Sequence, residues 1–443
     1  EIEESLVDEK VRNILRMMLR LKMIGPERKH RKTGAYNTEE HRRAVLDVAR
    51  ESMILLKNED QVLPLQAESG CKVAVIGVNA AAIHSNGGGS AEIKALYEIS
   101  PLMGIKKLLG GNVKVSYAPG YVIPDKKETS EINWQAASTE TAENTEKEST
   151  VSGRALDEKQ QEALAEAVAL AKASDIVIFV GGLNHDFDVE GLDRVNMKLP
   201  YGQDEVIDAL LKAVPDTVVC MYAGAPVEMP WAEKAKAILW SYYAGMEGGT
   251  ALAEILSGKV NPSGKLAETF IRDASQCPAH TIGTFGKKDR VEYREGVMVG
   301  YRYYDTKKTD VLFPFGHGFS YTSFTYDDLE IIKQQENGRQ TVKVSCSVTN
   351  TGKRAGKETI QIYVAPEQKK DRPVHELKAF EKVRLDAGET KRICVILEER
   401  DFSRYDTDKK MPVPVNGTYE IQVGASSTDI CLCGKIDLFF AEG

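Results

Sequence analysis

Residues 2–24 carry apolar side chains at helical spacing, and a polar basic stretch comes after them. The apolar positions recur every three or four residues: Val7, Val11, Ile14, Leu15, Met18 and Leu21. This spacing predicts an amphipathic helix, which Gly25-Pro26 would end. Residues 26–37 resemble a linker in composition. Because a helix so apolar on one face needs a surface to pack on, we expect it to belong to a different domain from the rest of the chain.

From residue 38 the pattern alternates between helix and strand. Helices are predicted at residues 41–56, 100–109, 157–173, 203–213 and 250–256, and strands at 71–79, 113–117, 176–180, 217–222 and 237–242. Strands separated by helices predict βαβ units, and therefore an α/β domain with a parallel or mixed sheet and helices on both faces. Residues 126–154 are rich in Glu, Thr and Ser and predict an exposed insertion.

The pattern changes near residue 326. Short alternating strands are predicted at residues 342–348, 359–365, 382–385, 392–397 and 417–423, separated by turn signals such as Ala387-Gly388. Such strands are typical of a β-sandwich of roughly a hundred residues. The expected organisation is a helix (1–25), a linker (26–37), an α/β domain (38–325) and an immunoglobulin-like or fibronectin III-like β-sandwich (326–443).

Composition and charge narrow the function. A chain of 443 residues predicts two or three domains, and a net charge of −8 argues against a nucleic-acid partner. The apolar runs are too short for a membrane span, and the charged opening is not a signal peptide. Seven cysteines without CxxC spacing favour buried free thiols and a cytoplasmic location. The chain starts within helical sequence and without Met, which leaves open a targeting segment further upstream.

An acidic, glycine-bearing loop follows the predicted strand at residues 176–180. It contains Asp186, Asp188, Glu190 and Asp193. In open α/β sheets, ligands bind beyond the carboxyl ends of the strands, so a carboxylate held there among apolar walls is placed for general acid/base catalysis.

Glu190 is the first candidate in this loop. A carboxylic acid kept protonated near neutrality can donate to a leaving-group oxygen, as glycoside hydrolysis requires. The alternative is an exposed loop acid, or a local ion pair with Arg194. We expect Asp186 and Asp188 to be capping or solvated groups, and Asp193 and Arg194 to be a pair that fixes the loop.

A second loop contains Gly87-Gly88-Gly89-Ser90. These glycines would let backbone N–H groups approach a ligand, with Ser90 bonding a hydroxyl; a tight turn before a helix is an equal alternative. Neither GxGxxG nor GK[ST] is present, so a nucleotide-binding protein is poorly supported. His84 and His185 lack further ligands at metal spacing, and we predict no metal and no cofactor. The aromatic residues at 301–321 favour a domain junction over sugar stacking.

Several segments together resemble family 3 glycoside hydrolases, specifically the β-glucosidase group with a fibronectin type III-like domain. The matching strings are ESMILLKNEDQVLPL, SNGGGSA, LNHDFDVEGLDRVNMKLPYGQDEVI, AGAPVEMPW, YYAGMEGGTALAEILSGKVNPSGKL, YREGVMVGYRYYD, FPFGHGFSYTSF and ELKAFEKVRLDAGE. They cover nearly the whole chain in a fixed order, which makes the resemblance specific.

The resemblance implies a retaining hydrolase with an N-terminal (β/α)8-like barrel, an α/β sandwich domain and a β-sandwich. An aspartate of the barrel would be the nucleophile, and Glu190 matches the acid/base position. Gly89 and Ser90 lie in a segment similar to one that borders the sugar, Phe187 would line the aglycone side, and Asp193 and Arg194 would support the loop.

The chain departs from this family pattern in one respect, because nothing in it resembles the nucleophile motif or the lysine-histidine motif of the barrel. Residues 1–25 resemble the closing helix of the barrel. Since retaining hydrolysis needs two carboxylates about 5–5.5 Å apart, we expect this chain to be inactive alone. The barrel would come from a second chain, a cleaved precursor or a part of the gene outside this sequence.

The expected function is therefore one part of a β-glucosidase that acts on terminal β-D-glucosyl residues of a β-glucoside or oligosaccharide. The alternative is a non-catalytic carbohydrate-binding or scaffolding protein. The sugar, the linkage, the role of residues 126–154 and the oligomeric state, including a homo-oligomer, stay open.

Overall fold

The computed structural model describes residues 2–30, 34–124, 158–286, 289–336, 339–367 and 372–440. They fall into two units, Glu1–Ala44 and Val45–Gly443. The predicted insertion at residues 126–154 lies outside the described residues. No helix in the described ranges combines the length and the apolar character that crossing a membrane requires.

The first unit contains α1 (Glu4–Arg20), which confirms the predicted N-terminal helix. Its large apolar side chains are not buried. The following are between 44 and 56% exposed: Leu6, Val7, Val11, Ile14, Leu15, Met17 and Leu19.

The second unit opens with the end of α2 (Glu39–Ser52), followed by β1 (Ile54–Asn58). The helix predicted over residues 41–56 is therefore too long. Residues 53–56 are completely buried apolar side chains, and β1 pairs antiparallel with β6 (Ala237–Trp240). Tertiary pairing with a distant strand overrides the helical continuation here, because a run of four apolar residues is compatible with either structure.

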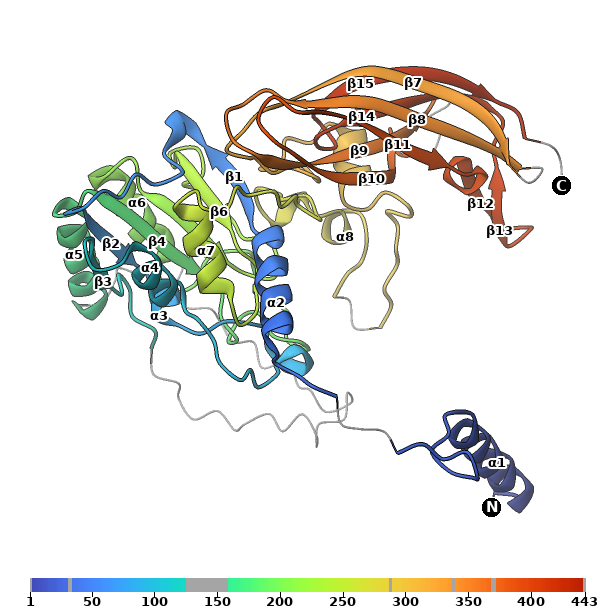
Figure 1. Cartoon of the computed structure of the whole chain (residues 1–443), viewed down its shortest axis with the longest axis horizontal. Coiled ribbons are helices and arrows are strands. Elements are labelled where there is room, and N and C mark those ends of the chain that lie inside the picture. Colours follow the sequence, from blue (N-terminus) through green and yellow to red (C-terminus); the bar gives the residue numbers. More distant parts are fainter. Residues whose placement is uncertain are drawn as a thin grey trace. The chain divides into compact units, whose positions relative to one another are not determined.

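A six-stranded sheet forms the centre of the α/β part of this unit (Figure 1). It contains β2 (Lys72–Ile76), β3 (Lys114–Ala118), β4 (Ile176–Gly182) and β5 (Val218–Tyr222) besides β1 and β6, in the order β1-β6-β5-β4-β2-β3. All neighbouring pairs are parallel except β1 with β6. The prediction of a parallel or mixed sheet is confirmed, and the sheet is mixed.

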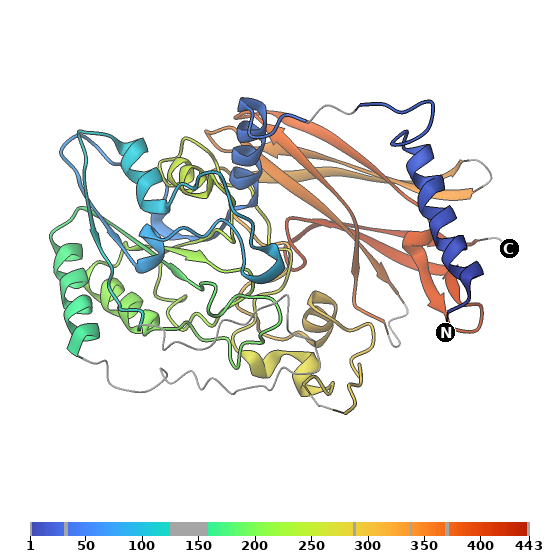
Figure 2. The same ribbon diagram turned by 90° about the horizontal axis from the view of Figure 1, so that it is seen from below.

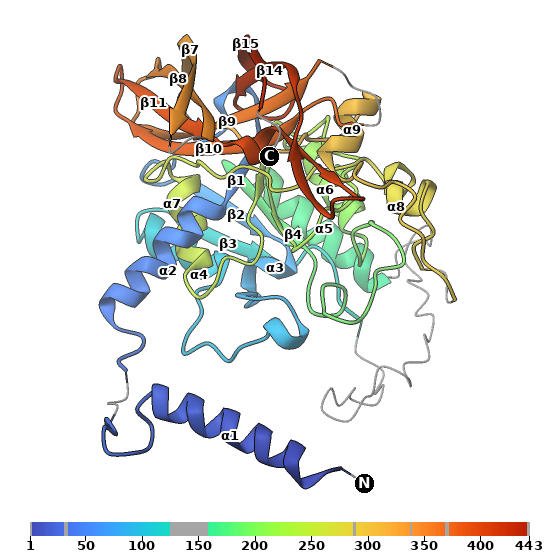
Figure 3. The ribbon, with the colours of Figure 1, turned by 90° about the vertical axis from the view of Figure 1, so that its right-hand side faces the viewer.

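Helices cover both faces of this sheet (Figure 3). On one face, α5 (Glu158–Lys172) and α6 (Gln203–Ala213) pack against Val177 and Phe179 of β4. On the other, α4 (Pro101–Leu109), α7 (Gly248–Leu256) and the end of α2 pack against Ile178 and Val180. Because β4 is buried on both faces, its sequence is a continuous apolar run rather than an alternating one.

The strand order fixes where a ligand can bind. Numbered along the chain, the five parallel strands β2 to β6 follow the order 2-1-3-4-5, with β2 beside β4. The chain leaves β2 toward α4 on one face and leaves β4 toward α6 on the other. The loops after β2 and β4 therefore diverge at a topological switch point, where α/β sheets of this type place their ligands.

A β-sandwich completes the second unit, as predicted (Figure 2). One sheet has β11 (Thr390–Leu397), β8 (Arg339–Asn350) and β7 (Phe324–Glu336). The other has β10 (Glu376–Leu385), β9 (Gly356–Pro366), β14 (Gly417–Gly424) and β15 (Ile430–Leu438). The short strands β12 (Ser403–Asp406) and β13 (Met411–Pro414) form a separate hairpin. The sequence pattern did not predict β7, β15 or this hairpin.

Charged and aromatic side chains join the α/β part to the sandwich. Lys265 Nζ lies 2.9 Å from Glu358 Oε1, with the two side chains 13% and 8% exposed. Glu51 of α2 pairs with Lys357 and Lys382 of the sandwich. Tyr301, which begins α9 (Tyr301–Lys307), stacks on Phe315 and meets Tyr363 of β9 edge-on. The aromatic-rich segment therefore forms a domain junction, as the sequence favoured.

The cysteines are only partly buried, which corrects the sequence prediction. Cys220 and Cys346 are buried, whereas Cys394, Cys431 and Cys433 are exposed. The three exposed thiols lie at outward-facing positions of β11 and β15, and a strand that looks apolar from its composition still directs alternate side chains to solvent.

Candidate active site

Two loops meet at the switch point. The loop after β2 includes the short α3 (Val78–Ala81), the glycine run and the 3₁₀ turn η2 (Gly89–Ala91). The loop after β4 contains the acidic cluster. Gly88 forms an isolated parallel bridge with Val189, in which the Gly88 N–H donates to Asp188 O over 3.1 Å and the Glu190 N–H donates to Gly88 O over 3.4 Å. The two predicted loops therefore form one continuous site.

The side chain of Glu190 is held by the facing loop and is otherwise exposed. The Ser90 N–H donates to Glu190 Oε2 over 2.8 Å. Hydrogen bonding from the Ser90 hydroxyl and N–H lowers the pKa of Glu190 below its ordinary value. Donors from the facing loop stabilise the carboxylate form of Glu190, and the sequence hypothesis of a protonated acid held among apolar walls stays a prediction.

Arg194 does not pair with Glu190. Its Nη2 donates to Pro226 O over 3.0 Å, and it interacts through charge with Asp188 and Glu268. Burial lowers the pKa of the Arg194 guanidinium. Asp193, which we predicted as its partner, is exposed, and no hydrogen bond of its side chain occurs within the described ranges.

Asp188 connects the acidic loop to the neighbouring strands. Its Oδ2 accepts from the hydroxyl of Tyr243 over 3.0 Å and from the Gly224 N–H. Burial and the charge of Asp188 together raise the pKa of Tyr243. Asp188 is therefore engaged across loops and is not simply a solvated group.

The start of the acidic loop is fixed by a second set of contacts. The hydroxyl of Tyr201 donates to Asp186 Oδ2 over 3.1 Å, and the Phe187 ring meets Tyr201 edge-on at 5.5 Å. Gln203 of α6 exchanges two hydrogen bonds of 2.8 Å with the backbone of Gly182. Phe187 is half-buried against this core, so its contact with an aglycone stays a prediction.

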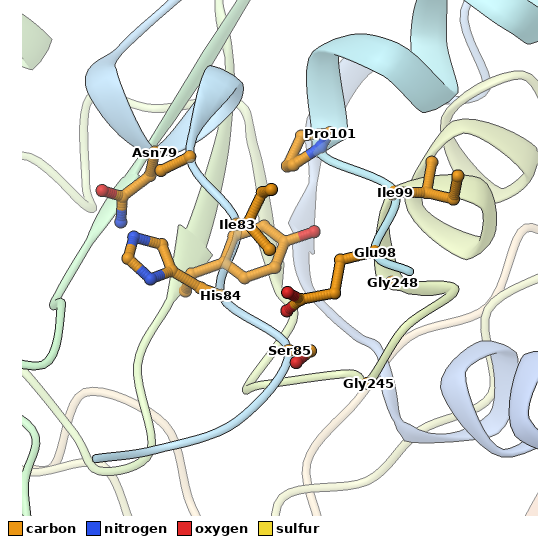
Figure 4. A pocket seen from close by; sticks show the side chains of 12 residues that line it. Asn79, Ile83, His84, Ser85, Glu98, Ile99, Pro101, Gly245 and Gly248 are labelled. Carbon is orange, nitrogen blue, oxygen red and sulfur yellow. The ribbon is translucent and has the colours of Figure 1, made fainter. Parts of the chain in front are cut away.

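Both histidines lie in these loops without forming a metal centre. The His84 and His185 rings are 5.9 Å apart, and His185 Nε2 lies 2.8 Å from Asn86 O. Burial lowers the pKa of His84, which lines a small pocket together with Asn79 and Glu98 (Figure 4). Nowhere in the described ranges do three or more His, Cys, Asp or Glu side chains form a group suited to a metal ion.

Sequence reasoning missed Tyr243, Gln203 and Glu98 as members of the site. Tyr243 lies just beyond the end of β6, after Ser241 and Tyr242, so the rule that ligands bind beyond the carboxyl ends of strands could have indicated it. Gln203 and Glu98 gave no comparable signal. Gln203 bonds the backbone of Gly182 at the end of β4, and Glu98 lines the pocket beside His84.

Comparison with known proteins identifies both parts of the second unit. The glycosyl hydrolase family 3 C-terminal domain matches residues 53–321, more than half of the chain. The fibronectin type III-like domain matches residues 358–427.

Individual relatives are similar over nearly the whole chain. Thermostable β-glucosidase B of Acetivibrio thermocellus is 38% identical over 433 residues, covering 98% of this chain and 52% of the relative. A β-glucosidase structure from Bifidobacterium adolescentis superposes with a TM-score of 0.81 at 33% identity, covering 99% of this chain and 58% of that one. β-Glucosidase 3B of Thermotoga neapolitana, solved with α-D-glucose, gives 0.77 at 30% identity, covering 98% and 59%. The chain thus spans little more than half the length of these proteins.

Proposed function

The chain belongs to glycosyl hydrolase family 3, and on that premise we propose that it supplies the general acid/base of a retaining β-glucosidase acting on terminal β-D-glucosyl residues. One observation carries the proposal: Glu190 lies at the switch point of the sheet, fixed by Ser90 on one side and open on the other. The names of the similar proteins, and the glucose bound in one of them, support this substrate class.

The second carboxylate is proposed to be an aspartate of a barrel domain that is not among the described residues. Asp186 and Asp188, the neighbours of Glu190, are engaged with Tyr201 and Tyr243, so neither is free to attack a sugar. A retaining mechanism needs a nucleophile about 5–5.5 Å from the acid. We therefore propose that the barrel comes from another chain or from a further segment of the same precursor, and that the exposed apolar face of α1 is an assembly surface.

In the assembled enzyme the nucleophile attacks the anomeric carbon while Glu190 gives its proton to the departing glycosidic oxygen. This step leaves a glycosyl-enzyme ester and an ionised Glu190. Glu190 then takes a proton from water, whose oxygen attacks the anomeric carbon and releases both glucose and the nucleophile. Glu190 ends protonated, as it began.

The hydrogen bonds from Ser90 favour the carboxylate that the second step needs, because they lower the pKa of Glu190. Apolar cover and a second carboxylate at about 5–5.5 Å would each raise it. Docking of the barrel is therefore proposed to raise the pKa of Glu190 and so to favour the protonated acid that the first step needs. The exposed free thiols of Cys394, Cys431 and Cys433 are consistent with a reducing compartment, and we propose a cytoplasmic location.

Turnover of aryl β-glucosides by the chain, alone and with the barrel domain, tests the proposal. We expect an inert chain, activity on addition of the barrel, and a loss in E190Q that is larger for poor leaving groups than for good ones. The exposed Glu92 on the facing loop provides a matched control, because E92Q removes a carboxylate that does not contact Glu190. Full activity of the chain alone, or an unchanged rate of E190Q on a poor leaving group, would contradict it. Glucose binding without turnover in every combination would favour a carbohydrate-binding protein.

A further inference from the structure

We propose that Gly88–Ser90 is a positioning device for Glu190, in which the glycines admit the acidic loop into backbone contact and Ser90 orients the carboxylate. The assignment rests on the proposed function only in so far as Glu190 is the acid/base. It gives the glycine run a task distinct from the ligand contact or simple turn that its sequence suggests.

At the switch point, the pairing between β2 and β4 ends before the two loops begin, so other contacts must hold the loops together. The chain leaves β2 and β4 toward opposite faces of the sheet, so the ladder between these strands does not continue into their loops. The isolated bridge between Gly88 and Val189 restores a short piece of parallel pairing beyond the strand ends. Glu190 is the next residue after this bridge.

Gly88 allows the bridge to form at close range. A Cβ at this position would lie 2.9 Å from Val189 Cγ2 and 3.0 Å from Val189 Cβ. The backbone of Gly88, with φ −76° and ψ 170°, is one that any residue adopts. Its lack of a side chain is therefore explained by the contact and not by backbone conformation.

Gly89 is constrained twice. Its φ of +82° favours glycine, and a Cβ would lie 2.6 Å from Glu190 Cβ. Gly87 is the counter-example in the same run, because a Cβ there would have no heavy atom nearer than 3.9 Å. The requirement for glycine thus increases along the run toward the residue that touches Glu190.

Ser90 completes the arrangement through its N–H, which reaches Glu190 Oε2 at 2.8 Å. The acidic loop is also anchored beyond Glu190, where Arg194 reaches Pro226 O at 3.0 Å. Glu190 is therefore held between two fixed points, with its carboxylate directed by the first.

The ionisation of Glu190, measured by ¹³C NMR titration of the glutamate carboxyl carbons in the full chain and assigned by the signal missing in E190Q, tests the device without requiring activity. We expect G89A to raise the titration midpoint toward that of an ordinary glutamate and G88A to raise it by less. The double variant G88A/V189A should return it toward the wild-type value, because V189A removes the nearest clashing atom. G87A should leave the midpoint unchanged.

Unchanged midpoints in both G88A and G89A would overturn the proposal, as would an equal shift in G87A. If G89A does not fold, the set of G87A, G88A and G88A/V189A decides alone, since none of these introduces backbone strain.

Turnover of the barrel-complemented enzyme separates this proposal from the proposed function. In G89A we expect kcat to fall about a hundredfold with KM little changed, because misplacing a catalytic group by about 1 Å costs that much. Shifted titration midpoints in G88A and G89A, together with normal turnover of E190Q, would support the positioning role of Gly88–Ser90 and rule out Glu190 as the acid/base. A severe loss of turnover in E190Q, with unshifted titration midpoints in G88A and G89A, would retain Glu190 as the acid/base and rule out the positioning role of Gly88–Ser90.

Discussion

The junction between the α/β part and the sandwich differs sharply from the switch-point edge of the same sheet. At the junction, the largely buried side chains of Lys265 and His375 find partners within the chain. Lys265 is paired with Glu358 and also donates to Gly318 O, and His375 lies between Asp305 Oδ2 at 3.1 Å and Gln422 Oε1 at 2.8 Å.

The switch-point edge leaves such groups unmatched. Buried atoms without a hydrogen-bond partner within the described ranges include His84 Nδ1, Asn86 Oδ1 and Arg194 Nη1. Apolar side chains of the same two loops are exposed, namely Ile83 (55%), Ile93 (71%), Leu96 (59%), Leu192 (44%) and Val195 (68%). Apolar side chains exposed as a group often mark a binding surface, and unpaired buried polar atoms call for a specific explanation. What distinguishes the switch-point edge is therefore the exposed apolar side chains that accompany its unpaired buried atoms.

Removal of the Glu190 carboxylate gives the largest expected effect and separates the two regions most clearly. In barrel-complemented E190A, turnover of a poor-leaving-group β-glucoside should fall by about 10²–10⁴-fold, the usual contribution of a positioned acid/base. Thermal unfolding of the chain should not change, because the carboxylate is exposed. A lowered Tm with equal loss on all substrates would instead make Glu190 a structural residue.

Breaking the Lys265–Glu358 pair at the junction should lower the stability of the chain, in contrast to removal of the Glu190 carboxylate. K265M leaves Glu358 buried without its cation and should destabilise the chain by about 3–5 kcal/mol in urea unfolding. The double variant K265M/E358M is the control: removing both charges should recover much of this loss, because apolar replacements of a buried pair are often tolerated. An unaffected K265M would mean that the junction contributes little to stability.

A buried acid near the site should make stability depend on pH. Burial raises the pKa of Asp204, at the start of α6, to about 7, although Trp231 Nε1 donates to it over 2.9 Å. Since this pKa is above that of the unfolded chain, the stabilisation is present below about pH 4 and is lost as the pH rises through about 7.

Tm measured from about pH 4 to 8 checks this prediction. Wild type should lose stability relative to D204N over that interval. Parallel curves of Tm against pH for wild type and D204N would show that ionisation of Asp204 does not lower the stability of the folded chain.

The smallest expected effect concerns the exposed apolar rim. L192S should change the stability of the chain by less than about 0.5 kcal/mol, as is usual for surface sites. Its affinity for the barrel domain, measured by calorimetry, should nevertheless fall. L252S is the contrasting variant, because Leu252 is completely buried against the sheet and its replacement should prevent stable folding. Equal affinity of L192S and wild type would remove the rim from the docking surface.

The sequence predicted those features that local pattern encodes. The central helices and strands, the sandwich and the acidic loop beyond β4 all follow from apolar periodicity and turn residues. The antiparallel edge strand β1 did not, because its apolar run is compatible with helix or strand and only its pairing with β6 decides. The contact of the glycine run with Glu190 was equally hidden, since it joins residues a hundred positions apart.

The edge strand β1 cannot complete its pairing until much later parts of the chain have been synthesised. Its residues are synthesised before residues 237–240, with which they pair, and before the segment ahead of the sandwich. In that segment the Phe319 N–H donates to Leu55 O over 2.8 Å and His317 Nε2 lies 2.8 Å from Leu56 O. About 260 residues must therefore be synthesised before this apolar strand is covered on both edges. A nascent chain that exposes such a strand for so long is a natural client for chaperones.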